Sequence, residues 1–290
     1  MKKFTFKLLT VLLTCVILLP LIIACDKEDV SEPTEEEKFN ALSEEEKAFY
    51  ILNTEADTNQ RAAIKVRLSL QNGSYQNRSV SASAFVETVN VDTEDRYFDY
   101  TKTVVSIKIS QKFNSMLTAA QSETVVKTGW TDGSYFEYTK TSSGSGSEIS
   151  KKCTPQTKEE YISKKKKLEE EATELSGLEM GDNFGITREN CSTATCVQLE
   201  DGTWKATFTD VNEECLAEFK KLAKPFEQFV KIDNIQDIIL ELTVTSDFKP
   251  ISAKIIFGEA VTYNDYLSLT CQYAIGDDVV EPEIDLSEYN

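Results

Sequence analysis

Along most of this chain, apolar and polar residues alternate with a period of two. The clearest runs, in which every second residue is apolar, are 64–71, 80–86, 105–110, 238–244, 251–257 and 267–273. Alternation of this kind is the pattern of a β-strand with one buried face and one solvated face. Eight or so such strands joined by short turns predict an α+β fold built on a mostly antiparallel sheet.

Two Asp-Gly pairs mark tight turns between strands. The pair at 132–133 separates the strand patterns of 124–130 and 135–140, and a second pair at 201–202 precedes another alternating run. Asp-Gly between two strand patterns is a strong signal for a hairpin, because its backbone conformations match the twist of the flanking strands. The Ser/Gly stretch at 142–147 is expected to be a flexible loop.

Three helices are expected beside the strands. A capping box opens a short helix over 43–53, and a highly charged helix over 157–175 is expected on the outside of the molecule. A third helix, 211–230, is capped by Asp210 and has a wide apolar stripe, and Pro225 should kink or split it. It is the only helix apolar enough to cover the buried face of the sheet.

The N-terminus has the pattern of a secretory signal peptide. Three lysines precede the short apolar run 8–23, and Ile22-Ile23-Ala24-Cys25 resembles the bacterial lipobox. We therefore expect residues 1–24 to be removed and Cys25 to carry a lipid. This places the protein outside the cytoplasm, anchored by its lipid to the cell membrane or the outer surface. The alternative is an ordinary cleaved signal with a chance cysteine.

The rest of the chain divides by composition into three parts. Residues 25–42 are acidic, contain a proline and are expected to form an extended tether. Residues 43–276 contain the strand and helix patterns and are expected to form a single α+β domain. Residues 277–290 are again acidic and are expected to be a loose tail or an edge segment.

Three segments resemble the LolA/LppX-like half-barrel lipoproteins of bacterial envelopes. They are TDGSYFEYTK, EDGTWKATF and ELTVTSDFKPISAKIIF, together with the lipobox at Cys25. The resemblance implies a curved, mostly antiparallel sheet, a half-barrel, packed on one or two helices in a single domain. It also implies a cavity for acyl chains or lipoproteins and no catalytic residues. Five domain cysteines and the charged helix at 157–175 depart from the family pattern.

Composition excludes several classes of function. The chain has no histidine, which removes Ser-His-Asp triads, Cys-His dyads and His-ligated zinc or haem sites. The net charge of −18 opposes binding to nucleic acid, because phosphate contacts need a surface of lysine and arginine. We expect a non-enzymatic protein without a cofactor or a metal. Its expected partners are the membrane, through Cys25, a lipid or other apolar ligand, and an envelope protein.

The cysteines of the domain are Cys153, Cys191, Cys196, Cys215 and Cys271. Outside the cytoplasm such residues are able to form disulfides. Cys191 and Cys196 are the candidate pair, because only four small residues separate them in a stretch that reads as a loop. A bridge between Cys215 and Cys271 is an alternative that the sequence does not decide.

One face of the predicted sheet is the candidate site for an apolar ligand. Its expected residues are Leu68, Ala84, Ile107, Phe219, Phe226, Leu240, Leu242, Ala253 and Leu269. Phe136 is expected on the same face. Small alanines among larger side chains leave room for a ligand if the helix does not fill the space. The alternative is a solid core, in which case the protein is a structural or adhesive interaction module.

Overall fold

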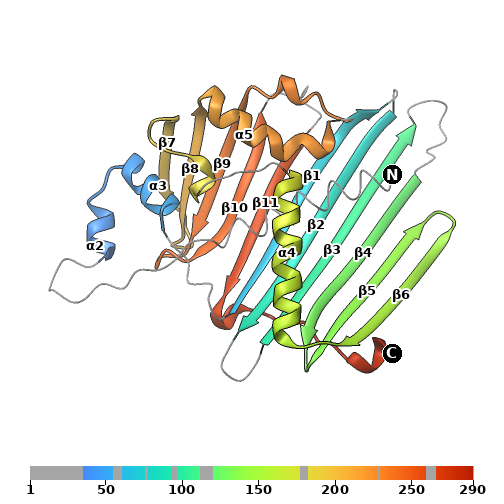
Figure 1. Ribbon diagram of the computed structural model, residues 1–290. Coiled ribbons are helices and arrows are strands. Elements are labelled where there is room, and N and C mark those ends of the chain that lie inside the picture. The colour runs from blue at the N-terminus through green and yellow to red at the C-terminus, as the bar shows by residue number, and fades with distance from the viewer. Residues whose placement is uncertain are drawn as a thin grey trace.

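The centre of the molecule is one sheet of eleven antiparallel strands, seen in the computed structural model of Figure 1. The structure describes residues 35–54, 61–75, 78–92, 97–111, 120–176, 182–227, 229–258 and 266–289. The sheet is open, with β6 at one edge and β7 at the other. The predicted fold class is confirmed: a curved, antiparallel sheet with helices packed on it, in a single domain.

Two meanders make up the sheet. The first consists of β1 (Arg61–Tyr75), β2 (Arg78–Asp92), β3 (Tyr97–Gln111), β4 (Ala120–Thr131), β5 (Ser134–Ser143) and β6 (Gly146–Pro155). The second consists of β7 (Cys191–Gln198), β8 (Trp204–Val211), β9 (Asp237–Val244), β10 (Pro250–Gly258) and β11 (Tyr266–Ile275). Because β1 pairs with β11, the strand order is β6-β5-β4-β3-β2-β1-β11-β10-β9-β8-β7.

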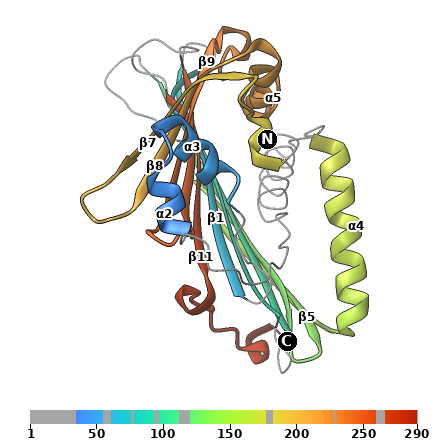
Figure 2. The same cartoon turned by 90° about the vertical axis from the view of Figure 1, so that its left-hand side faces the viewer.

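Four α-helices accompany these strands in the described part of the chain. They are α2 (Glu35–Asn40), α3 (Glu44–Leu52), α4 (Lys158–Ser176) and α5 (Glu213–Ala223). Helix α4 carries the chain from the edge strand β6 back toward β7 at the opposite edge, and α5 crosses the ends of the second meander (Figure 1). Figure 2 shows α4 and α5 on the same side of the sheet. We call the sheet face on that side the inner face and the opposite face the outer face.

Local sequence signals set the ends of the helices. The capping box at Ser43 and Glu46 is confirmed, with the Ser43 N–H donating to the Glu46 carboxylate at 2.9 Å. The α-helix of α5 ends at Ala223, and a 3-10 turn, η2 (Lys224–Phe226), follows it where Pro225 interrupts the hydrogen bonding. The N-cap of α5 is Asn212, whose side chain accepts from the Cys215 N–H at 2.9 Å, and not Asp210.

Two strands of the structure correct the sequence analysis. The 142–147 stretch is not a loop: only residues 144–145 form the turn, and Ser143 pairs with Gly146 to join β5 and β6. Strand β7 covers the stretch that reads as a loop around Cys191 and Cys196. Strands β6 and β7 are the two edge strands of the sheet. They contain many polar residues and therefore lack the alternation that marks the central strands.

The domain is longer at both ends than the predicted 43–276. Residues 35–40 are helical, and Phe39 is 1% exposed, with its ring 4.7 Å from Phe248 and 5.0 Å from Trp204. At the other end, Val279 and Tyr289 are buried on the outer face. The extended tether therefore cannot include residues 35–42, and the acidic tail is part of the packed structure. The predicted signal peptide and Cys25 lie outside the described residues.

Phe39 gives a direct test of where the domain begins. We expect Phe39→Ala to lower the free energy of unfolding by about 3–5 kcal/mol, because it empties an aromatic pocket of the core. The neighbouring Asn40 is exposed, so Asn40→Ala is the matched control and should change stability by less than about 0.5 kcal/mol. Urea denaturation measures both. Equal, small effects would mean that this segment is a tether after all.

Candidate apolar binding face

The structure brings all nine predicted face residues into one buried cluster. Ala84 lies on β2 between Leu68 of β1 and Val105 of β3. Ala253 lies on β10 between Leu242 of β9 and Cys271 of β11. All nine are buried, with the most exposed at 8%. Seven of them belong to the inner face of the sheet, since strand residues two apart point to the same side. Phe219 and Phe226 pack on that face from helix α5 and the 3-10 turn after it.

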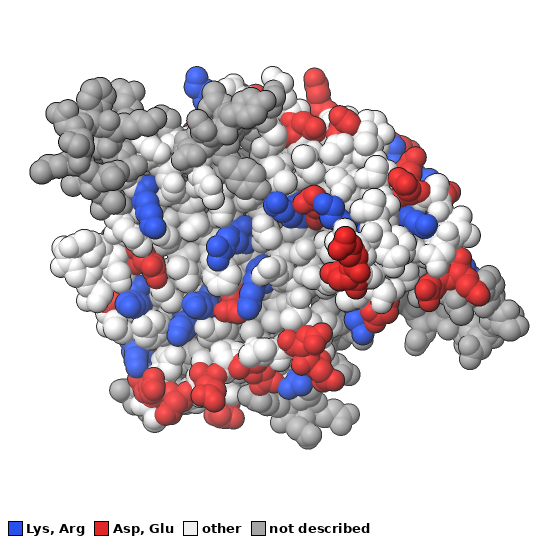
Figure 3. Space-filling model, turned by 180° about the vertical axis from the view of Figure 1, so that it is seen from behind, with Lys and Arg blue, Asp and Glu red and all other residues white. Residues whose placement is uncertain are grey.

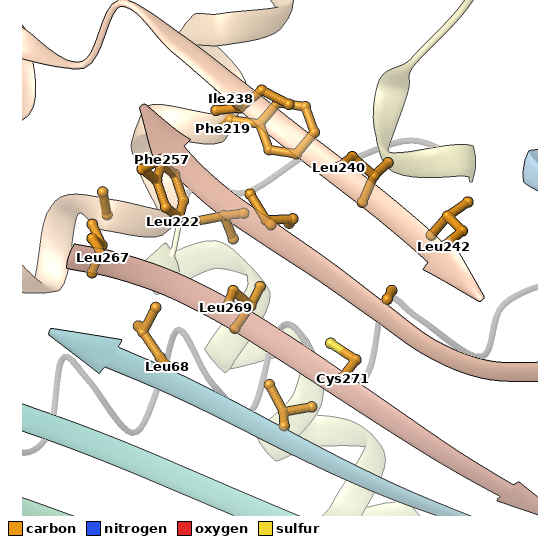
Figure 4. Packing of buried hydrophobic residues seen from close by; sticks show 14 of the residues in the cluster. Leu68, Phe219, Leu222, Ile238, Leu240, Leu242, Phe257, Leu267, Leu269 and Cys271 are labelled. Carbon is orange, nitrogen blue, oxygen red and sulfur yellow. The ribbon is translucent and has the colours of Figure 1, made fainter. Parts of the chain in front are cut away.

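Helix α5 covers the part of this face that the second meander forms. Its amphipathic sequence buries Leu216, Phe219, Leu222 and Ala223, and Phe226 of the following turn is also buried. Figure 4 shows Phe219 beside Ile238 of β9 and the cluster continuing through Leu269 to Leu68. Helix α3 adds Phe49, whose ring lies 5.4 Å from that of Phe208 on β8. Aromatic side chains of two helices thus pack on the same face.

The apolar face ends at β3. Beyond it four threonines stand at inner positions of β4 and β5: Thr124, Thr128, Thr139 and Thr141. These side chains are half-buried or exposed rather than buried. The inner face therefore has an apolar half, over β1–β3 and β8–β11, and a polar half, over β4–β6.

Helix α4 is attached near the start of β3, beside the polar half, by a buried carboxylate. Asp99 of β3 is 2% exposed, and its carboxylate accepts a hydrogen bond from the Tyr161 hydroxyl at 2.9 Å. The ammonium group of Lys165, one turn later, contacts the same carboxylate oxygen. Burial raises the pKa of the Tyr161 phenol, and the negative charge of Asp99 raises it further. The phenol therefore stays protonated and remains a hydrogen-bond donor.

Aromatic rings surround this contact. The ring of Tyr161 lies 6.4 Å from that of Tyr97 and 6.1 Å from that of Tyr135. Lys158 places its ammonium group 4.3 Å from the centre of the Tyr97 ring, a cation–π distance. The sequence analysis expects this helix on the outside, and most of its described residues are indeed exposed. The attachment at Asp99 was not expected from the sequence, although counting back by twos along β3 from Ile107 places Asp99 on the inner face.

The outer face carries a second, smaller cluster. Phe136 is buried there against Tyr289 of the tail, with ring centroids 5.5 Å apart. The expectation that Phe136 shares the inner face is wrong, because it pairs with Gly129 and Cys153, whose positions point outward. The final 3-10 helix, η5 (Leu286–Tyr289), supplies the contact. The apolar residues of the tail, Val279, Ile284 and Leu286, were the signal for this packing.

A groove of about 520 Å³ lies on the outer face beside this cluster. Strands β1, β2, β10 and β11 form its floor, and the tail segment 278–282 forms one wall. Lys65 and Glu87 form an ion pair of 3.2 Å in its lining, and burial raises the pKa of the Tyr100 phenol beside them. Figure 3 shows that both signs of charge are interspersed across this side of the molecule. None of the nine predicted face residues lines the groove.

The structure contradicts the predicted disulfide. Cys191 and Cys196 lie five residues apart on β7, roughly 16 Å in an extended strand, whereas a disulfide needs Cα atoms about 4.4–6.8 Å apart. Neither forms a disulfide, nor does Cys153, Cys215 or Cys271. Burial raises the pKa of the Cys196 and Cys215 thiols to about 11 each. These cysteines act as small core side chains.

The described residues contain neither a metal-binding cluster nor a membrane-spanning helix. No three Cys, Asp or Glu side chains gather there into a group able to hold a metal ion. Among the helices that the structure describes, none has the length and apolar character needed to cross a membrane.

Comparisons with known proteins add little to this geometry. The sequence matches no protein-family model and no curated protein. One similar solved structure is a beta-barrel-like protein of a domain of unknown function, DUF1849, from Brucella abortus. It is 10% identical, the match covers 74% of this chain and 97% of that one, and the TM-score is 0.19. At that score the likeness carries no argument about this chain.

The attachment of α4 can be tested at Asp99. We expect Asp99→Ala to destabilise the protein by roughly 1–3 kcal/mol, because the buried Tyr161 hydroxyl loses its acceptor. Hydrogen exchange of the α4 amides should accelerate more than that of the strands. Asp92→Asn is the matched control, since Asp92 forms an exposed ion pair with Lys158 on the same helix that is worth less than about 1 kcal/mol. Identical exchange in both variants would refute the attachment.

Proposed function

We propose that this chain is a lipid-anchored lipoprotein of the cell envelope that binds an apolar, lipid-like ligand on its inner face and catalyses no reaction. The observation that carries the proposal is the gathering of all nine predicted face residues into one apolar cluster on one side of an open sheet. Among the described residues, the buried charged side chain is Asp99, which lies near the start of β3 and outside the cluster. A ligand held there would have to be apolar, because a buried charge without a partner is strongly unfavourable.

Small residues inside the cluster support a binding role. Ala82 and Ala84 of β2, Ala206 of β8 and Ala253 of β10 hold inner positions among leucines, isoleucines and phenylalanines. An alanine side chain extends only a short distance from the sheet. Alanine positions therefore leave more space for a ligand between the sheet and the helices that lie on its inner face. Helix α4 lies on the same side of the sheet (Figure 2) and is attached at Asp99, near the start of β3 and away from the apolar residues Val105 and Ile107 of that strand. Helix α4 could thus cover a ligand that is bound on the inner face.

The anchor and the location rest on the sequence. The lysine-rich start, the apolar run and Ile22-Ile23-Ala24-Cys25 are what support lipidation and a position outside the cytoplasm. The resemblance to the LolA/LppX-like half-barrel lipoproteins agrees with this location and with an apolar cargo.

A solid core is the competing interpretation, and one observation favours it. Ala84 is 0% exposed and Ala253 is 3% exposed, as they would be in a filled core. In that case the inner face only stabilises the fold, and the protein is a structural or adhesive module that acts through its surface. The two interpretations differ in what happens when these alanines are enlarged.

We expect Ala84→Leu and Ala253→Leu to leave the melting temperature almost unchanged and to remove copurified lipid. Added methylenes are tolerated in a ligand site, whereas in a filled core they cost about 1–3 kcal/mol. The measurement is mass spectrometry of solvent-extracted lipid from the purified full chain, beside thermal unfolding. Ser83→Leu is the control, because Ser83 points to the outer face between Ser69 and Ser106. Destabilisation by both alanine variants, without any lipid in the wild type, would reject the carrier.

The anchor has its own test. We expect Cys25→Ala to abolish lipidation, so that the protein either leaves the membrane fraction or accumulates as an uncut precursor. Cys15→Ala, which changes the cysteine inside the apolar run, should be processed and anchored normally. Fractionation and intact-mass measurement distinguish these outcomes. A Cys25→Ala protein that is correctly cleaved and remains on membranes would contradict the lipobox interpretation.

A further inference from the structure

In the part of the chain that the structure describes, strand β6 leaves a long edge of the sheet open. It pairs with β5 on one side and ends the strand order on the other. All of its residues except Cys153 are exposed, and Ile149 is 54% exposed. The C-terminal helix η5 touches β6 through Lys151, whose ammonium group lies 3.6 Å from Glu288. That contact lies on the outer face, not along the edge. An exposed edge of this kind is a template for another strand.

The turn before β6 determines which of its backbone groups face outward. Ser143 and Gly146 flank a two-residue turn, so they exchange hydrogen bonds with each other. Hydrogen-bonded and non-hydrogen-bonded pairs alternate along an antiparallel ladder. The N–H and C=O groups of residues 148, 150 and 152 therefore point to β5. Those of residues 147, 149, 151 and 153 point away from the sheet, ready to pair with a new strand.

The charges of β6 favour pairing with a second copy of itself. Glu148 and Lys152 stand on the inner side of the strand, two residues on either side of Ser150. If two β6 strands run antiparallel about a two-fold axis at Ser150, each Glu148 faces the Lys152 of the other copy. The same register makes Ile149 and Lys151 a hydrogen-bonded pair, as the outward backbone groups require. Opposite charges at directly opposed positions stabilise a strand pair.

Neighbouring registers lack this match. A two-fold axis at Glu148, Lys151 or Lys152 opposes two identical charges, which is destabilising. An axis at Ile149 pairs Glu148 with Ser150 and leaves both lysines without a carboxylate. The segment also has one acidic and two basic side chains, in a chain whose net charge is −18. It is therefore a place where two strongly acidic molecules can approach without local repulsion.

We propose that two copies of this chain associate through β6, antiparallel and centred on Ser150, so that the sheet continues from one copy into the other. The interface is isologous, the usual form for a closed dimer. A single strand pair buries less surface than a typical stable interface, so the association is weak in dilute solution. Copies held on one membrane meet at much higher effective concentration. The proposal does not depend on whether the inner face binds a ligand.

Cross-linking of the full chain in membranes tests this register. Opposed residues of a non-hydrogen-bonded pair have Cα atoms about 4.5 Å apart, within the range of a disulfide. In a Cys153→Ser background, Ser150→Cys should give a disulfide-linked dimer on mild oxidation with copper phenanthroline. Ser147→Cys in the same background is the matched control, because its equivalent in the other copy lies roughly 20 Å away along the strands. Equal yields from the two variants would overturn the proposal.

Charge reversal provides the second test. With Ser150→Cys present, Glu148→Lys and Lys152→Glu should each reduce the cross-linked fraction several-fold, because they oppose like charges. The two changes together restore opposite charges and should restore the cross-link. If the single variants lost the cross-link by misfolding, combining them would not restore it. A restored cross-link therefore reports on the charge pairing itself. Loss of the cross-link in the double variant, or no loss in either single variant, would show that β6 does not pair in this way.

Discussion

The pairing of β1 with β11 is the interaction on which the rest of the structure depends. It joins ten residues of the first strand to ten of the last, from Ala62 with Ile275 to Gln71 with Tyr266. Without it, the two meanders would be separate sheets, and the inner face would be divided at its centre between Leu68 and Leu269. A contact so distant in sequence requires closure of nearly the whole chain, so we expect it to be a late step in folding.

The two faces of this sheet are used differently. The inner face is apolar over one half and rich in threonine over the other, and α3, α4 and α5 lie on its side. The outer face is covered in part by the C-terminal segment, where Arg61 binds Glu281 at 2.6 Å across 220 residues of sequence. The acidic tail thus stabilises the fold and encloses a groove. One strand order therefore produces an apolar face, a groove and the open edge at β6.

Much of the candidate face was predictable because it follows from alternation. Once Leu68 is assigned to a buried face, the residues two positions away share that face. Phe136 was assigned to the wrong face because alternation within one strand does not specify which of its two sides faces the core. The pairing register of β4 and β5 determines that Phe136 points to the outer face. The attachment of α4 at Asp99 was not predictable in the same way. A single aspartate in a sequence is normally predicted to be a solvated surface charge. In the structure a tyrosine and a lysine of a helix distant in sequence contact Asp99.

The sequence by itself determined the central strands, the Asp-Gly turns, the helix starts at Ser43 and Thr157 and the break of α5 at Pro225, because each depends on residues a few positions apart. Only the tertiary structure decided that β1 meets β11, that Phe39 and Tyr289 belong to the folded domain, that Cys191 and Cys196 lie too far apart to pair, and that β6 is an open edge. These outcomes depend on contacts between segments far apart in the chain, whose order in the sheet no local pattern specifies.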